Sequence, residues 1–515
     1  MAKRAKKLMI QGTMSGTGKS ALTAGFLRLF AREGLKCAPF KSQNMALNSG
    51  VTAEGLEMGR AQIMQARAAR KEPDVRMNPI LLKPEGDRKS QVIFRGHAIG
   101  SYSTKEYFEK RGDFLPDIVS CFESLSADND VIIIEGAGSP AEINLNVCHN
   151  DIVNMGLAEA IDAPVLLAAD IDRGGAFAQC LGTYEWLRPE EKDRVKGFLF
   201  NKFRGDPTLL APGPELLFER TGVPLLGVVP YADIELDDED SLAERLHERK
   251  GSGSAILDIA VIRLPHISNF TDFIPLTIPF ISSVRYVENA ENLGTPDLII
   301  LPGTKTTMED LRWLKGRGLA EKIIGFARAG GRVFGLCGGY QMLGQSLSDP
   351  TGNDGGGEEE GLGLLHTRTV FSEEKSLLQC RGWYATPGDG PEIAGYQIHA
   401  GMTEGPDPPM NYLRHDGGNV SAQRLTGSSS SVLENMVPEG AVNGNICGTY
   451  IHGIFDTASF LRTFLKDLAA ARGKAIPKTV PVESRREREE KDFDLLADTL
   501  EQSVDMKAIR QIIGL

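Results

Sequence analysis

The N-terminal half of the chain takes its fold from the stretch Leu8-Met9-Ile10-Gln11-Gly12-Thr13-Met14-Ser15-Gly16-Thr17-Gly18-Lys19-Ser20. This stretch joins a short apolar strand to a glycine-rich turn, and the residues from Ala21 to Arg32 continue it as a helix. Gly12 lies six residues before Gly18, one residue more than the standard spacing of a phosphate-binding loop. The order of strand, loop and helix predicts a nucleotide-binding α/β domain.

Each part of this loop can hold part of a nucleotide. Successive backbone N–H groups form a concave anion site, Lys19 can reach the β and γ phosphates, and the Ser20 hydroxyl can ligate magnesium. The expected nucleotide contacts are Gly12, Thr13, Ser15, Gly16, Thr17, Gly18, Lys19 and Ser20.

A second apolar run, Val131-Ile132-Ile133-Ile134, is typical of a buried parallel strand and ends in Glu135-Gly136-Ala137-Gly138. Because a carboxylate at such a strand end faces the phosphate loop, Glu135 is the expected acidic partner of magnesium. The alternative is an ordinary capping or solvent-exposed glutamate.

The C-terminal half contains Gly335-Leu336-Cys337-Gly338-Gly339 between the strand-like residues 331–334 and the helix-like residues 340–343. Gly-x-Cys-x-Gly in this position indicates a nucleophile elbow, a tight turn that lifts one side chain clear of the sheet edge. The helix that follows would offer backbone N–H groups to a developing oxyanion. We therefore interpret Cys337 as a nucleophile, against the alternative of a buried cysteine that only packs.

A cysteine nucleophile needs a base, and the chain has eight histidines. His452, in Gly448-Thr449-Tyr450-Ile451-His452-Gly453, follows a strand-like run and so is expected on the same rim of a parallel sheet as the elbow. His399 is the second choice. The sequence alone leaves both open.

Composition narrows the functional class. The net charge of −12 argues against nucleic acid as a partner. The longest apolar runs are too short for a membrane span, so we expect no membrane association. The seven scattered cysteines include no Cys-x-x-Cys pair, which argues against a disulfide framework and indicates a reducing, cytoplasmic location.

Strand-like and helix-like stretches alternate along most of the chain, which predicts an α/β protein with two parallel-sheet domains. One of the expected strands of the first sheet is Gln91 to Phe94. A flexible segment, Lys250-Gly251-Ser252-Gly253-Ser254, precedes a new strand at Ile256. The expected divisions are 1–240 for the phosphate-loop domain, 241–255 for a linker, 256–465 for the elbow domain and 466–515 for a helical C-terminal extension.

Further segments carry a family resemblance over almost the whole chain. The phosphate loop with its longer spacing and the Glu135 strand end resemble the dethiobiotin synthetase type of ATPase, and the elbow domain resembles the flavodoxin-like class I glutamine amidotransferases. Together they resemble the cobyric acid synthases of cobalamin biosynthesis. The other matching segments are Phe40 to Met45, Met77 to Pro84, Ile134 to Glu142, Asp170 to Gly175, Asn201 to Asp206, Leu264 to Asp272 and Pro302 to Lys305.

The resemblance implies an enzyme that uses ATP, Mg²⁺ and L-glutamine to amidate the b, d, e and g side-chain carboxylates of a corrinoid, adenosylcobyrinic acid a,c-diamide. It implies that the amides of Gly303 and Gly338 are oxyanion donors and that Asn201 reads adenine. Lys41 and Arg173 would bind the transferring phosphoryl group or the substrate carboxylates, with surface ion pairs as the alternative. Asp151 and Asp172 would orient magnesium or substrate, with helix capping equally open.

Two positions depart from the wider amidotransferase pattern. Gly453 follows His452 where most class I amidotransferases have the Pro-Glu that completes a triad, so we expect a Cys–His dyad. Gln397 stands where many relatives have a glutamate. Two other functions stay open: the sister cobyrinic acid a,c-diamide synthase, and a ParA-like nucleotide switch with a degenerate amidotransferase domain. The sequence does not indicate the oligomeric state.

Overall fold

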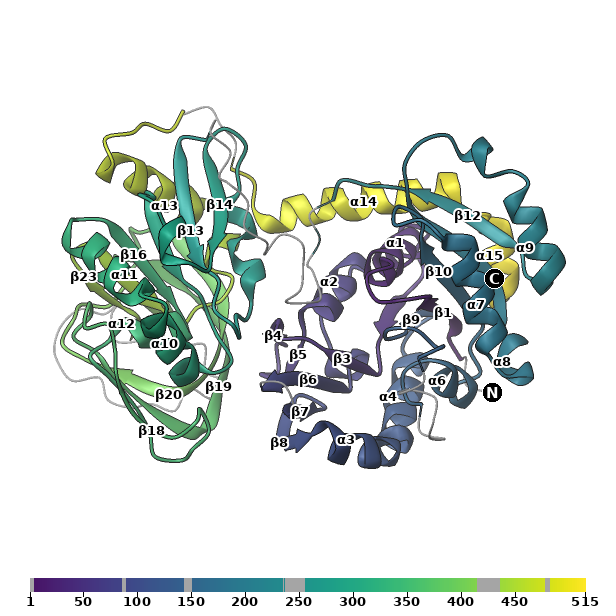
Figure 1. The fold of residues 1–515 in the computed structure, drawn as a ribbon, viewed down its shortest axis with the longest axis horizontal. Coiled ribbons are helices and arrows are strands. Elements are labelled where there is room, and N and C mark those ends of the chain that lie inside the picture. Colours follow the sequence, from purple (N-terminus) through teal and green to yellow (C-terminus); the bar gives the residue numbers. More distant parts are fainter. Residues whose placement is uncertain are drawn as a thin grey trace. The chain divides into compact units, whose positions relative to one another are not determined.

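A computed structural model describes residues 4–85, 89–142, 151–234, 236, 255–414, 436–477 and 482–515. The chain forms two compact units, and each is built from segments that lie far apart in the sequence (Figure 1). The first unit contains Met1–Ala46, Leu56–Glu239 and Arg488–Leu515. The second contains Leu47–Gly55 and Asp240–Glu487.

A six-stranded parallel sheet forms the centre of the first unit, in the order β12-β11-β10-β1-β9-β2. The central residues of its strands are mostly apolar and buried, as in a parallel sheet that is covered on both faces. The strands are β1 (Lys6–Gly12), β2 (Cys37–Phe40), β9 (Val131–Glu135), β10 (Val165–Asp170), β11 (Val195–Phe203) and β12 (Leu225–Pro230). The helices around it include α1 (Lys19–Arg32), α2 (Arg60–Ala68), α4 (Leu115–Ala127), α6 (Met155–Ala160), α7 (Ala176–Trp186) and α9 (Gly213–Thr221).

A smaller sheet in the first unit corrects one expectation. Gln91 to Phe94 does form a strand, within β7 (Lys89–Phe94), but β7 pairs antiparallel with β6 (Ile80–Glu85) and β8 (His97–Ser103). β3 (Gln43–Met45) pairs parallel with β6. The turn at Arg95-Gly96, where both residues have positive φ, folds β8 directly back on β7 and leaves no room for a crossover helix.

The C-terminal helices complete the core of the first unit. The buried side chains of α14 (Arg485–Ser503) and α15 (Met506–Ile513) join one apolar cluster with β1 and α1. An added Cβ on Gly25 of α1 would lie 2.6 Å from Leu500 Cδ1, so a glycine permits this close approach. The expected extension 466–515 is thus shared, with Arg488–Leu515 in the first unit and the preceding part in the second.

The second unit also has a central sheet, in the order β14-β13-β15-β16-β24-β23. Its first five strands are parallel, and the edge strand β23 (Ala441–Asn443) is antiparallel. The parallel strands are β13 (Leu257–Ile262), β14 (Ser282–Val287), β15 (Leu298–Leu301), β16 (Arg332–Leu336) and β24 (Ile446–Thr449). Its helices are α10 (Thr307–Gly316), α11 (Leu319–Arg328), α12 (Gly338–Leu343) and α13 (Ala458–Ala471).

A second sheet in this unit is built around a long antiparallel pair, β19 (Arg368–Tyr384) and β20 (Glu392–Glu404). The remaining strands are β17 (Ser346–Asp349), β18 (Gly357–Glu360), β21 (Asn411–Arg414) and β22 (Met436–Glu439). One short strand from early in the chain, β4 (Ser49–Val51), lies in the segment that belongs to this unit.

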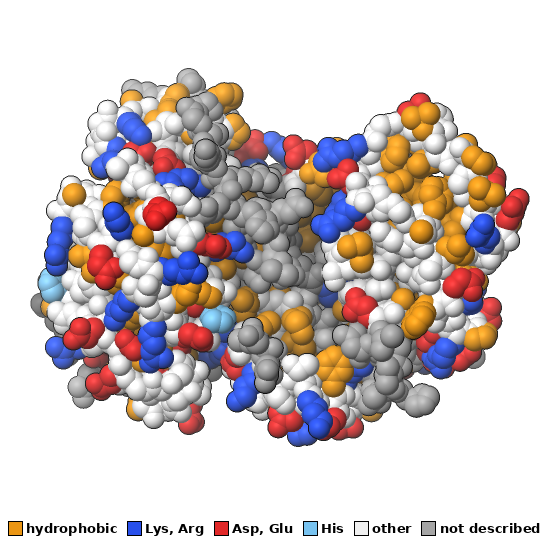
Figure 2. All heavy atoms as spheres, in the orientation of Figure 1, with side chains coloured by type: hydrophobic (Ala, Val, Ile, Leu, Met, Phe, Trp, Pro, Cys, Tyr) orange, Lys and Arg blue, Asp and Glu red, His pale blue; other side chains and the backbone are white. Residues whose placement is uncertain are grey.

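Two further features bear on the expectations. Of the predicted linker, only residue 255 lies within the described residues. Within those residues no helix is long and apolar enough to cross a membrane. Figure 2 shows hydrophobic side chains gathered on one face of the first unit. Exposed large hydrophobic residues in this unit include Leu216 and Phe218 of α9, and Leu209 and Tyr231.

Candidate functional site

The phosphate loop has the backbone that its glycines predict. Gly16 and Gly18 have φ values of 77° and 86°, in the left-handed region that glycine adopts without strain. The loop is held from β11, two strands from β1 in the sheet, because Asn201 Nδ2 donates to the Thr17 carbonyl at 2.9 Å and Lys202 Nζ donates to the Gly16 carbonyl at 2.6 Å. The loop therefore presents its N–H groups from a fixed frame.

The remaining loop residues are placed as follows. Lys19, at the start of α1, donates to the carbonyls of Met14 and Gly138, at 3.3 and 3.2 Å. Thr13 Oγ1 donates to Gln179 at 3.0 Å. An added Cβ on Gly12 would lie 2.5 Å from Thr17 Oγ1, so the glycine at this position lets the turn close. Ser15 is exposed at the rim of the loop.

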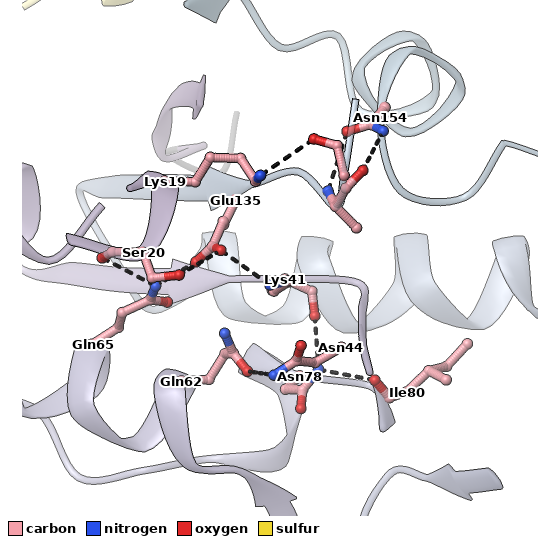
Figure 3. A network of polar contacts seen from close by, with 12 residues as sticks. Lys19, Ser20, Lys41, Asn44, Gln62, Gln65, Asn78, Ile80, Glu135 and Asn154 are labelled. Carbon is pink, nitrogen blue, oxygen red and sulfur yellow. Dashed lines mark hydrogen bonds and ion pairs between the residues drawn. The ribbon is translucent and has the colours of Figure 1, made fainter. Parts of the chain in front are cut away.

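Glu135 is the centre of a buried polar network (Figure 3). Its Oε1 accepts from Ser20 Oγ at 2.9 Å and from Lys41 Nζ at 3.0 Å, and its Oε2 accepts from Gln65. Only 1% of Glu135 and 2% of Lys41 are exposed. A buried carboxylate needs a positive partner, and Lys41 supplies it.

A second layer of amides fixes the backbone at Lys41. Asn78 Nδ2 donates to the Lys41 carbonyl at 3.0 Å and to the Ile80 carbonyl at 2.9 Å, and Asn78 Oδ1 accepts from Gly59 N at 3.0 Å. Asn44, beside it in Figure 3, donates to Gln62 at 2.9 Å. These contacts give a physical role to the Phe40 and Met77 segments that carried the resemblance.

The other proposed substrate residues have local partners. Asp151 accepts from the backbone N–H groups of Val153, Asn154 and Gly156, which is the capping alternative. Asp172 and Arg173 lie outside the Glu135 network. Asp172 pairs with Arg204 at 3.4 Å, and Arg173, half-exposed, lies 3.7 Å from Asp170.

Cys337 lies on a strained turn between β16 and α12. Its φ of 52° and ψ of −111° are unusual for a residue with a side chain, and its N–H donates to the Thr449 carbonyl of β24 at 2.9 Å. The thiol donates to the Ile398 carbonyl at 3.5 Å. This is the backbone of a nucleophile elbow.

His452 is buried beside Cys337 and is held by a carboxylate. Its Nδ1 lies 2.7 Å from Asp272 Oδ2, and Asp272 Oδ1 accepts from Gly453 N at 3.1 Å. Burial lowers the pKa of His452. The charge and hydrogen bond of Asp272, with a hydrogen bond to Cys337, outweigh this effect and raise the pKa to about 9. The three side chains form a Cys–His–Asp arrangement where we expected a dyad.

The two expected oxyanion donors both lie close to this arrangement. An added Cβ on Gly303 would lie 3.1 Å from His452 Cε1, and one on Gly338 would lie 2.8 Å from Thr304 Cγ2. Gly338 is the first residue of α12, so its N–H has no partner within the helix. The loop after β15 and the start of α12 therefore meet at the elbow.

His399 lies in the same region but has another environment. Its ring stacks on Tyr450 with centroids 3.7 Å apart, and its Nδ1 lies 3.1 Å from the Gly401 carbonyl. Burial lowers the pKa of His399 to about 4, so the ring is neutral at physiological pH. A stacked ring with so low a pKa accepts a proton weakly and is a less suitable base than His452.

Three residues of these networks were missed by sequence reasoning. Asp272 and Gln65 carry no motif of their own, and Asn154 holds the Ala137 peptide through two hydrogen bonds. The one available signal was for Asp272, which ends the Leu264 to Asp272 segment of the resemblance.

Comparisons with known proteins agree with both halves. Residues 8–242 match the CobQ/CobB/MinD/ParA nucleotide binding domain, and residues 258–460 match the CobB/CobQ-like glutamine amidotransferase domain. The chain is 48% identical to a cobyric acid synthase of Ruminiclostridium cellulolyticum, over 99% of this chain and 97% of the relative. It is 47% identical to cobyric acid synthases of Streptococcus sanguinis, over 99% of both chains, and of Photorhabdus laumondii, over 98% of this chain and 97% of the relative. Since these matches run through both units in order, the chain belongs to the cobyric acid synthase family.

Proposed function

We propose that the protein is an ATP- and glutamine-dependent ligase that converts side-chain carboxylates of a corrinoid, adenosylcobyrinic acid a,c-diamide, to amides. The observation that carries the proposal is the joint presence of the Ser20–Glu135–Lys41 network at a phosphate loop and the Cys337–His452–Asp272 arrangement in one chain of this family. The first can activate a carboxylate and the second can release ammonia.

The first unit would activate the acid. A carboxylate is a poor acyl donor, so the γ-phosphoryl group of ATP is transferred to it, giving an acyl phosphate and ADP. Lys19 and the loop N–H groups would hold the phosphates, and Asn201 would lie at the adenine side of the loop. Lys41 would hold the reacting carboxylate or the transferring phosphoryl group, with Arg173 as a weaker candidate because it is half-exposed.

The donor set fits Mg²⁺. A serine hydroxyl and a buried carboxylate oxygen, 2.9 Å apart, are the hard oxygen ligands that this ion takes beside nucleotide phosphates. Ser20 and Glu135 would hold the ion. When bound, Mg²⁺ supplies charge neutralisation on the phosphates.

The second unit would hydrolyse glutamine. The Cys337 sulfur attacks the side-chain amide carbon, and the amides of Gly303 and Gly338 stabilise the oxyanion. The C–N bond then breaks, and the nitrogen leaves as ammonia with a proton from His452. Water hydrolyses the thioester to glutamate, while ammonia displaces phosphate from the acyl phosphate.

Two variants separate these roles. Cys337→Ala should abolish amidation with glutamine but keep it with ammonium salts at alkaline pH, because the acyl phosphate still forms. Lys19→Ala should fail with either nitrogen source. Cys380→Ala is the matched control, since Cys380 is a buried thiol of β19 whose pKa is raised by burial to about 12. Loss of the ammonium-supported reaction in Cys337→Ala would contradict the division of labour.

The two matched domain families each include CobB and CobQ types, so the domains alone do not distinguish the two corrinoid ligases. The mass of the product distinguishes them. Incubation with cobyrinic acid, ATP and glutamine would identify the sister enzyme if amidation stops after the a and c groups. The full-length relatives favour cobyric acid synthase.

A glutaminase assay without corrinoid would exclude the nucleotide-switch alternative. The six described cysteines are all free thiols, which agrees with a reaction in the cytoplasm.

A further inference from the structure

Residues Leu47–Gly55 come from the N-terminal part of the sequence but belong to the second unit. They follow β3 in the chain, shortly after Lys41, and include the strand β4. The segment is buried at its centre, where Ser49 is fully buried and Val51 is 3% exposed. A buried backbone must find hydrogen-bond partners, and those partners identify what the segment does.

The peptide groups of Ser49 have two side-chain partners. Ser49 N–H donates to Asn269 Oδ1 at 2.8 Å, and the Ser49 carbonyl accepts from Tyr396 OH at 3.0 Å. Both partners are buried, Asn269 at 3% and Tyr396 at 7% exposure. One residue of the segment thus joins two parts of the second unit that are distant in sequence.

Each partner adjoins one of the catalytic side chains proposed above. The Tyr396 ring stacks on the His452 ring, with centroids 5.5 Å apart and 24° between the planes, and the two residues exchange both backbone hydrogen bonds. The Asn269 carbonyl accepts from Asp272 N at 2.9 Å in the first turn of the 3₁₀ helix Phe270–Leu276. Asn269 itself has a φ of 51°.

The segment also reaches the third catalytic side chain. Val51 packs in an apolar cluster with Tyr396 and Ile398, and Gln379 Nε2 donates to the Val51 carbonyl. The Ile398 carbonyl is the acceptor for the Cys337 thiol, at 3.5 Å. Positions 396 and 398 lie on one face of β20, so a single strand of the segment supports the environment of both Cys337 and His452.

We propose that Leu47–Gly55 is a positioning element of the glutamine-hydrolysing site, with Ser49 fixing the His452 side through Tyr396 and the Asp272 side through Asn269. The inference rests on the proposed glutaminase function. It assigns to the second unit a part that its own continuous sequence does not contain. Neither Tyr396 nor Asn269 takes part in the chemistry; both act through their neighbours.

Tyr396→Phe tests the first contact. The change keeps the ring on His452 and removes only the hydroxyl that binds the Ser49 carbonyl. We expect kcat for glutamine hydrolysis, and the rate at which a diazoketone analogue of glutamine alkylates Cys337, to fall about fivefold to tenfold, the factor for one lost hydrogen bond. KM for glutamine and ammonium-supported amidation should not change. Tyr412→Phe, on β21 of the same sheet, is the matched control.

A pair of substitutions at Asn269 tests the second contact. Asn269→Gly accepts the positive φ but lacks the oxygen that binds Ser49 N–H, so it should lower the same two rates by about fivefold to tenfold. Asn269→Asp keeps both the oxygen and a tolerated φ, and should restore most of the rate. If the role of Asn269 were purely structural, Asn269→Gly would lower the folded fraction and would lower amidation with glutamine and with ammonium together.

The outcomes distinguish this inference from the proposed function. If the unmodified protein does not hydrolyse glutamine, the proposed function fails. If it does, and the diazoketone alkylates Cys337 in Tyr396→Phe and in Asn269→Gly as fast as in the unmodified protein, the positioning role is overturned. The double variant Tyr396→Phe/Asn269→Gly supports the positioning role if its rate of glutamine hydrolysis falls by about 10²-fold while ammonium-supported amidation stays intact.

Discussion

At the scale of single residues, Asp272 gives the sharpest prediction. Asp272→Asn should lower glutamine hydrolysis by about 10² to 10⁴, because an amide no longer holds the tautomer and charge of His452. Amidation with ammonium salts should persist. The matched control is Asp407→Asn, which breaks a similar Asp–His pair with His366, 2.8 Å long, on the exposed side of the same unit.

The same variant makes a prediction about pH. Asp272 helps to raise the pKa of His452 to about 9, against the lowering effect of burial. Removing its negative charge destabilises the imidazolium, so the pKa must fall. Since the imidazolium protonates the departing nitrogen, the alkaline limb of the glutaminase pH–rate profile should move from about 9 to lower pH. An unshifted alkaline limb would remove Asp272 from this role.

Glu135 offers a matching prediction for the first unit. Glu135→Gln removes the charge beside Ser20 and the carboxylate that pairs with the buried Lys41 ammonium. We expect amidation to fall roughly a hundredfold or more with either nitrogen source, with a raised Mg²⁺ requirement in titrations. Glu123→Gln, on the exposed face of α4, is the control. Full activity at ordinary Mg²⁺ concentration would show that Glu135 has no part in cation binding.

Sequence reasoning reached the residues that carry a local pattern and missed those that act from a distance. Cys337 and Lys19 are marked by the glycines around them, since unusual backbone angles leave a trace in the residue type. Asp272 meets His452 only through the fold, from the 3₁₀ helix Phe270–Leu276, so spacing could not reveal it. Gln65 lies on α2 with helical spacing like any surface glutamine, and only tertiary packing buries it against Glu135.

At the scale of elements, apolar runs such as Val131–Ile134 were sufficient to predict the parallel strands, because buried strands are apolar on both faces. The strand Gln91 to Phe94, which lies within β7, was assigned to the wrong sheet, since a short strand shows its burial but not its partner. Polar and apolar residues alternate along parts of β19 and β20, because only one face of this pair is covered. Such alternation is a weaker signal than a continuous apolar run. A helical C-terminal extension was predicted, and the packing partner of its helix α14 was not.

That packing partner leads to an element-scale prediction. Phe493 of α14 is fully buried in the cluster with α1, and the buried Arg28 guanidinium lies 5.2 Å from its ring centroid. Phe493→Ala should destabilise the first unit by about 3–5 kcal/mol, through lost burial and a cavity. Leu495→Ala, exposed on the same helix, should change stability by less than about 0.5 kcal/mol.

Urea denaturation measures this effect. Binding of a nucleotide analogue monitors the unfolding of the first unit, and alkylation of Cys337 monitors that of the second. Two probes are needed because a chain with two units need not unfold in one step. The transition of the first unit should move to lower urea and that of the second should stay. Equal shifts of Phe493→Ala and Leu495→Ala would contradict the assigned role of α14.

At the scale of the whole molecule, the described residues contain one phosphate loop and one Cys–His–Asp arrangement, whereas the proposed substrate presents several carboxylates. The corrinoid must therefore be bound again in a new orientation for each amide. Tight contacts to the ring would favour one orientation, so the site should hold chiefly the reacting carboxylate. With substrate in excess, mass spectrometry should show partly amidated corrinoids early in the reaction. Detection of the fully amidated product alone would contradict this.

The way Arg488–Leu515 completes the first unit has a consequence for how the protein is made. The apolar cluster of β1 and α1 is closed by Phe493, Leu496, Leu500 and Ile509. On the ribosome, β1 and α1 emerge early, but these four side chains emerge only after the whole of Asp240–Glu487. One apolar face of the nascent first unit therefore stays uncovered while the second unit is translated. During this period chaperones can bind that face.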